Sequence, residues 1–305
     1  MNKAKVASLM LPACAAILQF ALTPELSAAD KLHAVSEQTA GGFAFPESAA
    51  YDAKAKVLYV GQFGGTELKP AEKDGKGKIS KVGLDGKILE EQFLPAAGET
   101  MNKPKGIWVR GERLWVTDID AVWVFDLKTR KGRKLDLPGV QFANDPAVKG
   151  NALYVSDNRS DQLVKVEPAD FLNAKKAPKV TVVFKDKGVN PNGVYPAKDG
   201  SLLAVGFKSD KEARGIYSVN DKGEVKPLSK DIGRLDGLYQ MADGSLLFTD
   251  WNSGSLMHWT AKGEPETVAS GFKGPADFCV IPGKELTVVV PDLPKGELRI
   301  IKLGK

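Results

Sequence analysis

Six polar residues, each at the start of a short apolar stretch, are the positions of this sequence best suited to act together in chemistry. They are Glu47, Lys105, Asn144, Asn192, Asp236 and Asp277. Glu47, Asn192 and Asp236 supply carboxylate and amide oxygens, and neither histidine, His33 or His258, lies near any of the six in sequence. Oxygen-only ligation favours Ca²⁺, Mg²⁺ or Mn²⁺ over zinc-type sites. Three protein ligands would leave coordination positions for water or substrate. The alternative is that these residues only cap strands and bond to backbone.

Each of the six residues opens a copy of one hairpin pattern. The stretch "RLDGLYQMADGSLLFTDWNSG" (234–254) contains a short strand, a glycine turn and a second strand rich in aromatic and β-branched residues. Related stretches begin at Pro46, Pro104, Asn144, Pro191 and Pro275. A third strand often follows, as in "AVWVF" (121–125), "LMHW" (256–259) and "LRII" (298–301).

The spacing of the hairpins predicts the architecture. The steps between successive polar residues run from 39 to 58 residues and average 46. Units of about 40–50 residues with four strands are typical of β-propeller blades. We therefore predict an all-β fold, a six-bladed β-propeller, and keep a sandwich of short strands as the alternative. The inner strand of each blade lines the central channel, so the six polar residues are expected to converge at one mouth.

The sixth unit is one strand short. Because an open edge strand invites pairing with other chains, we predict that the mature N-terminal strand, residues 31–37, closes the last blade. The strand-end aspartates Asp118, Asp157 and Asp250 occupy turn positions, where Asp side chains accept hydrogen bonds from nearby backbone N–H groups. We interpret these three as structural.

The N-terminus has the pattern of a secretory signal peptide. Lys3 and Lys5 precede an apolar run, 6–22, and Ser27-Ala28-Ala29 offers a cleavage site after Ala29. The predicted organisation is a signal peptide, 1–29, and a propeller domain, 30–305, in a periplasmic or secreted protein. A membrane anchor and a lipoprotein modified at Cys14 are the alternatives.

The composition of the chain limits the classes of partner that the mature protein is expected to bind. Cys279 is its one cysteine, so no internal disulfide is expected. The net charge of the full chain, +5, is small and the lysines are scattered, without the basic stripe that a nucleic-acid partner requires. No second stretch is long and apolar enough to span a membrane, so we expect no membrane association once the signal peptide is removed. A small molecule is the expected partner.

Four dipeptides add a resemblance to a known family. Pro46-Glu47, Asn144-Asp145, Asn192-Gly193 and Asp236-Gly237 follow one another at blade spacing. Through these four dipeptides and their spacing, essentially all of residues 31–305 resembles the SMP-30/gluconolactonase/luciferin-regenerating family of six-bladed propellers. The resemblance implies that Glu47, Asn192 and Asp236 hold a divalent cation, foremost Ca²⁺, with Mg²⁺, Mn²⁺ or Zn²⁺ as alternatives. It also implies that Asn144 contacts the substrate or a water on the cation.

The activity implied by the resemblance is hydrolysis of lactones or related esters. Asp236 is expected to act mainly as a metal ligand and secondarily as a general base. The alternative is a non-catalytic propeller, similar to NHL and YWTD types, that binds a small molecule or a protein. A Ser-His-Asp hydrolase has little support, because the sequence lacks a G-x-S-x-G motif.

Three features depart from the family pattern. Phe142 stands where lactonases of this family often have an arginine, which favours a more apolar lactone or ester. Lys105 in the second unit would repel a cation unless Asp277 neutralised it, or would itself fill the metal position. An insert in the first unit, residues 64–78, either folds over the channel mouth or forms a mobile surface loop; we favour the loop.

Overall fold

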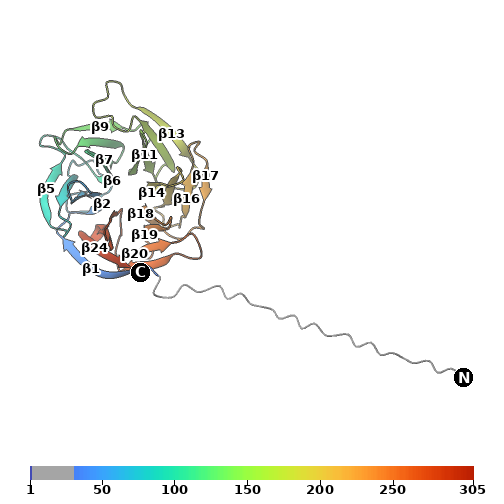
Figure 1. Ribbon diagram of the computed structural model, residues 1–305. Coiled ribbons are helices and arrows are strands. Elements are labelled where there is room, and N and C mark those ends of the chain that lie inside the picture. Colours follow the sequence, from blue (N-terminus) through green and yellow to red (C-terminus); the bar gives the residue numbers. More distant parts are fainter. Residues whose placement is uncertain (2–30) are drawn as a thin grey trace. The chain divides into compact units, whose positions relative to one another are not determined.

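The computed structural model describes Met1 and residues 31–305; apart from Met1, the predicted signal peptide lies outside them. Residues Leu32–Lys305 form one compact unit of six four-stranded antiparallel sheets arranged in a ring (Figure 1). This is the predicted six-bladed β-propeller. No helix in the described part of the chain is long and apolar enough to cross a membrane.

Each blade contains four strands, ordered from the channel outwards. Blades one to three contain β2 (Pro46–Asp52), β3 (Val57–Gln62), β4 (Lys78–Val82), β5 (Ile88–Leu94); β6 (Pro104–Arg110), β7 (Arg113–Asp118), β8 (Ala121–Asp126), β9 (Gly132–Asp136); and β10 (Ala143–Lys149), β11 (Ala152–Asp157), β12 (Gln162–Glu167), β13 (Lys179–Lys185). Blades four to six contain β14 (Pro191–Pro196), β15 (Leu202–Gly206), β16 (Ile216–Val219), β17 (Val225–Pro227); β18 (Leu235–Gln240), β19 (Leu246–Asp250), β20 (Ser255–Trp259), β21 (Glu266–Ser270); and β22 (Cys279–Ile281), β23 (Leu286–Asp292), β24 (Glu297–Gly304), β1 (His33–Gly41).

The N-terminal strand closes the ring, as predicted. β1 pairs antiparallel with β24 along most of its length, with His33 opposite Gly304 and Gly41 opposite Glu297. The two strands lie side by side in Figure 1. The closing strand begins two residues later than expected and extends to Gly41. β1 covers the edge of β24 and becomes the outermost strand of the sixth blade, which then has four strands like the other five.

The hydrophobic core lies between neighbouring blades. Trp115 of β7 packs in one cluster with Leu153 and Val155 of β11 and with Val164 of β12, and all four are almost fully buried. Because both faces of the middle strands are covered by adjacent blades, β3 and β11 are buried at every position. Blade-to-blade packing therefore holds the inner strands, and the residues at their starts, in a ring.

Hydroxyl groups also link successive inner strands. Ser156 Oγ, on β11, accepts a hydrogen bond from the backbone N of Asp145 in its own blade (2.8 Å) and donates one to the carbonyl of Asn192 in the next (2.6 Å). Thr249 likewise accepts from Gly237 N (2.8 Å) and donates to the carbonyl of Ala276 (3.1 Å). Buried pairings of this kind connect the ring positions directly.

Candidate functional site

The start of each inner strand is defined by one backbone pairing. In every blade a residue at the start of the inner strand pairs with the end of the second strand: Pro46 with Gln62, Pro104 with Asp118, Ala143 with Asp157, Pro191 with Gly206, Leu235 with Asp250, and Pro275 with Asp292. The next residue in each blade is the ring position. The six ring positions are Glu47, Lys105, Asn144, Asn192, Asp236 and Ala276.

Five of the six residues aligned from the sequence therefore occupy equivalent positions, and Asp277 does not. The structure puts Ala276 in the ring and Asp277 one residue later, equivalent to Asp145. Because successive strand residues point in opposite directions, Asp277 leaves the ring and lines a separate cavity that Asp145 also lines. Asp277 therefore does not contact the channel mouth as expected, and no ion pair joins it to Lys105 within the described residues.

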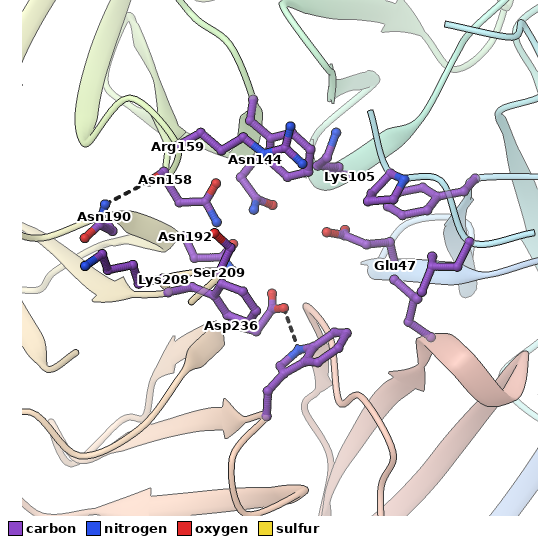
Figure 2. A pocket seen from close by; sticks show the side chains of 17 residues that line it. Glu47, Lys105, Asn144, Asn158, Arg159, Asn190, Asn192, Lys208, Ser209 and Asp236 are labelled. Carbon is purple, nitrogen blue, oxygen red and sulfur yellow. Dashed lines mark hydrogen bonds between the residues drawn. The ribbon is translucent and has the colours of Figure 1, made fainter. Parts of the chain in front are cut away.

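Five of the six ring residues, all but Ala276, line the floor of a cavity of about 340 Å³. Figure 2 shows the carboxylates of Glu47 and Asp236 and the amides of Asn144 and Asn192 directed towards a common space. Glu47, Asn144, Asn192 and Asp236 are each 5% exposed or less and come from four different blades. The structure thus brings together all four residues assigned to metal binding and catalysis, together with Lys105 and Phe142.

Glycine follows three of the ring residues because the channel is crowded there. A Cβ atom on Gly106 would lie 2.2 Å from Oδ1 of Asp145, and one on Gly193 would lie 2.2 Å from the carbonyl oxygen of Asp236. Neither clash can be relieved without moving the channel backbone. The glycine of the "NG" dipeptide is therefore required by the close approach of neighbouring inner strands.

Glu47 has the least compensated charge of the cavity floor. Its Oε2 atom is buried and has no hydrogen-bond partner among the described residues. Burial raises the pKa of Glu47 well above its ordinary value, and the negative charge of Asp236 raises it further. The nearby ammonium of Lys105 offsets only part of this effect. A buried carboxylate oxygen without a donor is costly unless a cation or a proton satisfies it.

Asp236 is held in a defined orientation. Its Oδ2 accepts a hydrogen bond of 2.8 Å from the indole Nε1 of Trp251. Burial raises the pKa of Asp236 to about 7, although Trp251, the nearby side chain of Asn192 and the charge of Arg234 act in the opposite direction. The carboxylate therefore retains proton affinity near neutral pH while its direction is fixed.

Lys105 does not occupy the centre of the oxygen-lined space. Its Nζ lies 4.0 Å from the ring centroid of Phe142 and donates a long hydrogen bond of 3.4 Å to the carbonyl of Lys103. Burial lowers the pKa of Lys105 to about 8 despite the opposing charge of Glu47. Within the described chain no ion pair joins Lys105 to Glu47. The ammonium is thus accommodated against an aromatic face and leaves the space between Glu47, Asn192 and Asp236 clear.

The wall of the cavity contains residues that the sequence analysis did not identify. Five of them immediately follow the last residue of a blade's second strand, the residue that pairs with the start of the inner strand. They are Phe63, Asn158, Phe207, Trp251 and Leu293. The repeat register that locates the inner ring thus also locates this second set, one residue beyond the second strand of a blade. Asn158 is 9% exposed, and its Oδ1 is buried without a partner in the described structure.

Two sequence interpretations of the cavity wall change in the structure. Phe142 does not make a purely apolar surface, because the guanidinium of Arg159 lies 3.9 Å from its ring centroid. The insert of the first blade reaches the cavity, since Leu68 and Pro70 line it. Part of the segment interpreted as a surface loop therefore belongs to the wall.

The strand-end aspartates make the backbone hydrogen bonds expected of them. Asp118 accepts from the backbone N of Asn102 (3.0 Å) and of Lys103 (2.8 Å). Asp157 and Asp250 also accept from backbone N–H groups, at 2.8 Å from Gln141 and 2.9 Å from Arg234. None of the three aspartates lines the cavity.

Comparison with solved structures identifies propellers of the same fold. A catalytically inactive variant of virginiamycin B lyase from Staphylococcus aureus, crystallised with quinupristin, is 17% identical, with a TM-score of 0.58 over 89% of this chain and 99% of that one. A putative gluconolactonase is 14% identical, with a TM-score of 0.64 over 89% and 94%. A chain of a nidogen/laminin complex is 15% identical, with a TM-score of 0.54 over 85% and 90%.

At sequence identities this low, the similarity to these solved structures establishes the fold of the chain alone. The similarity to a putative gluconolactonase agrees, at that level, with the propeller family that the four dipeptides resemble. In sequence, no protein family and no curated protein matches the chain.

Proposed function

We propose that this protein is a metal-dependent hydrolase of lactones or related esters, exported to the periplasm. The observation that carries the proposal is the buried, unpartnered Oε2 of Glu47 at the floor of a cavity that Asn144, Asn192 and Asp236 also line. Propeller enzymes are among the solved structures with this fold.

The residues present fit a divalent cation. Glu47, Asn192 and Asp236 would hold it, with Asn144 beside it. Within the described residues no cluster of three or more His, Cys, Asp or Glu side chains has the arrangement of a metal site. The set offered here is instead two carboxylates and two amides. Such oxygen donors suit Ca²⁺ first, then Mg²⁺ or Mn²⁺, and Zn²⁺ least well. Their raised proton affinity is what removal of a cation from buried carboxylates would produce.

The chemistry divides between the cation and the chain. A bound divalent cation acts as a Lewis acid on a carbonyl oxygen. Asn144 and Asn192 can orient the ester group through their amides, and Trp251 holds the carboxylate of Asp236 towards the cavity. The proton affinity of Asp236 near neutral pH would allow its free oxygen to accept a proton from the attacking water. Phe63, Phe207 and Leu293 exclude bulk water from the cavity wall.

The non-catalytic reading remains the alternative because a chain of a nidogen/laminin complex shares the fold at a similar identity. The lyase reading has less support. The inactivating change in the solved lyase replaces a histidine with alanine, whereas in the described chain His33 lies in β1 and His258 in β20, and neither lines the cavity.

The deciding experiment is a panel of lactones and esters assayed with the purified mature protein. Hydrolysis should stop on chelation and return with Ca²⁺, Mg²⁺, Mn²⁺ or Zn²⁺ in an order that identifies the ion. Asp236→Ala should abolish both cation binding and turnover. Normal hydrolysis by that variant, or activity that ignores the chelator, would refute the proposal.

A further inference from the structure

Two positive side chains share one aromatic ring at the cavity wall. The Lys105 Nζ lies 4.0 Å and the Arg159 guanidinium carbon 3.9 Å from the ring centroid of Phe142. Both residues line the cavity, Lys105 from the start of an inner strand and Arg159 from the turn after β11. Two like charges held this close repel each other unless a negative group lies nearby.

No carboxylate pairs with Arg159 in the part of the chain that the structure describes. In the described part of the chain it makes neither an ion pair nor a hydrogen bond, and its side chain is exposed at the cavity. Lys208, the third cation of the wall, is different because Asp210 pairs with it at 2.9 Å and Glu212 also contacts it. The five N–H donors of Arg159 are therefore available to a ligand.

The charge balance of the cavity favours an anion. The two carboxylates of the floor, Glu47 and Asp236, would be neutralised by one divalent cation. Lys208 is neutralised by its own partners. Among the groups that line the cavity, the charges of Lys105 and Arg159 then remain. The carboxylates of Asp118 and Asp157, whose charges also act on Lys105, do not line the cavity and accept hydrogen bonds from backbone N–H groups. A cavity with excess positive charge binds a negatively charged substrate faster and more tightly than a neutral one of the same shape.

We propose that the substrate is a lactone or ester that itself carries a carboxylate, bound by the guanidinium of Arg159 beside Phe142, with Lys105 as a second positive charge. The inference rests on the proposed hydrolase function. A planar guanidinium suits a carboxylate in a bidentate pair. Arg159 is thus a specificity residue that acts on the substituent, apart from the ester bond at the floor.

The test compares two substrates that differ only in charge, γ-butyrolactone γ-carboxylate and its γ-carboxamide. The wild-type protein, supplied with the activating cation, should hydrolyse the carboxylate with a kcat/KM about tenfold or more above that of the amide. Arg159→Gln should remove most of this preference through a higher KM for the carboxylate. Arg110→Gln is the matched control: Arg110 is also exposed and stacks on an aromatic ring, Trp115, at 5.7 Å, but does not line the cavity.

The outcomes separate this inference from the function on which it rests. Equal rates for both substrates, or a preference that persists in Arg159→Gln, would overturn the anion site and leave the hydrolase proposal intact. If neither lactone is hydrolysed, calorimetric titration of the two compounds into the cation-loaded protein decides. Binding of the carboxylate that is lost in Arg159→Gln would support the anion site and count against the hydrolase.

Discussion

Trp251 and Asp236 are joined by a hydrogen bond of 2.8 Å between the indole Nε1 and Oδ2. Asp236 starts the inner strand of the fifth blade, and Trp251 directly follows the end of its second strand. The pairing of Leu235 with Asp250 brings the two residues together. The register of the hairpin therefore positions Trp251 as the hydrogen-bond donor that orients Asp236, the proposed metal ligand.

Trp251→Phe removes this donor while keeping an aromatic ring in the wall. We expect the affinity for the activating cation to fall by about tenfold to a hundredfold, as is usual when a group that orients a metal ligand is lost. Isothermal titration calorimetry measures the change. Trp259→Phe is the control, because its indole bonds to the carbonyl of Gly263 in the same blade, outside the cavity. Equal effects of the two substitutions would refute the orienting role.

Glu47→Gln should have opposite effects on the cation-free and cation-loaded proteins. The amide keeps the shape of the side chain and removes a buried negative charge that lacks a partner. We expect the cation-free protein to gain about 1–3 kcal/mol in free energy of unfolding at pH 8, since unpaired buried charge is destabilising. Added cation should then no longer raise the Tm in differential scanning calorimetry. A lower Tm without cation would contradict the account of Glu47.

The cation-free protein should lose stability as the pH rises from about 4 to about 7. The pKa of Asp236 is raised to about 7 in the folded protein, so the folded state holds a proton that the unfolded chain has already released. The free energy of unfolding then falls with pH, by at most about 1.4 kcal/mol per pH unit for this group.

Urea unfolding at a series of pH values in chelator measures this slope. Asp236→Asn should flatten it, and cation at saturating concentration should abolish the decline because it binds the ionised carboxylates. An unchanged slope in Asp236→Asn would show that other groups dominate.

Ser156→Ala should loosen the contact between the third and fourth blades. The hydroxyl connects the backbone N of Asp145 to the carbonyl of Asn192, and both hydrogen bonds are buried. Loss of both should lower the free energy of unfolding by about 1–3 kcal/mol, seen as a lower urea midpoint with an unchanged slope. Ser218→Ala, which removes a partly buried bond to Ser201 at the side of one blade, should have a smaller effect. Similar losses in both variants would argue against a special role for the Ser156 hydroxyl.

Much of the fold could be predicted because the repeat is encoded locally. Each hairpin carries its own turn and its own strand pattern, with a glycine in every turn but the first, so six copies at a spacing near 46 residues specify six blades. The missing strand of the last copy likewise predicted its closure by the N-terminal strand. Equivalent positions of equivalent blades must converge in a ring, and this predicted the meeting of Glu47, Asn144, Asn192 and Asp236.

Only the tertiary structure shows which side chains face the cavity where this depends on a one-residue shift in register or on the packing of a neighbouring blade. Asp277 follows the ring residue of its blade, and the pairing of Pro275 with Asp292 sends it to another cavity. Arg159 reaches Phe142 because the pairing of Ala143 with Asp157 places the turn after β11 beside the residue that precedes β10. Local sequence determines which residues form strands, since periodicity and turn chemistry act over a few residues. Register and packing between blades determine which side chains face one another, because strand faces alternate at every residue.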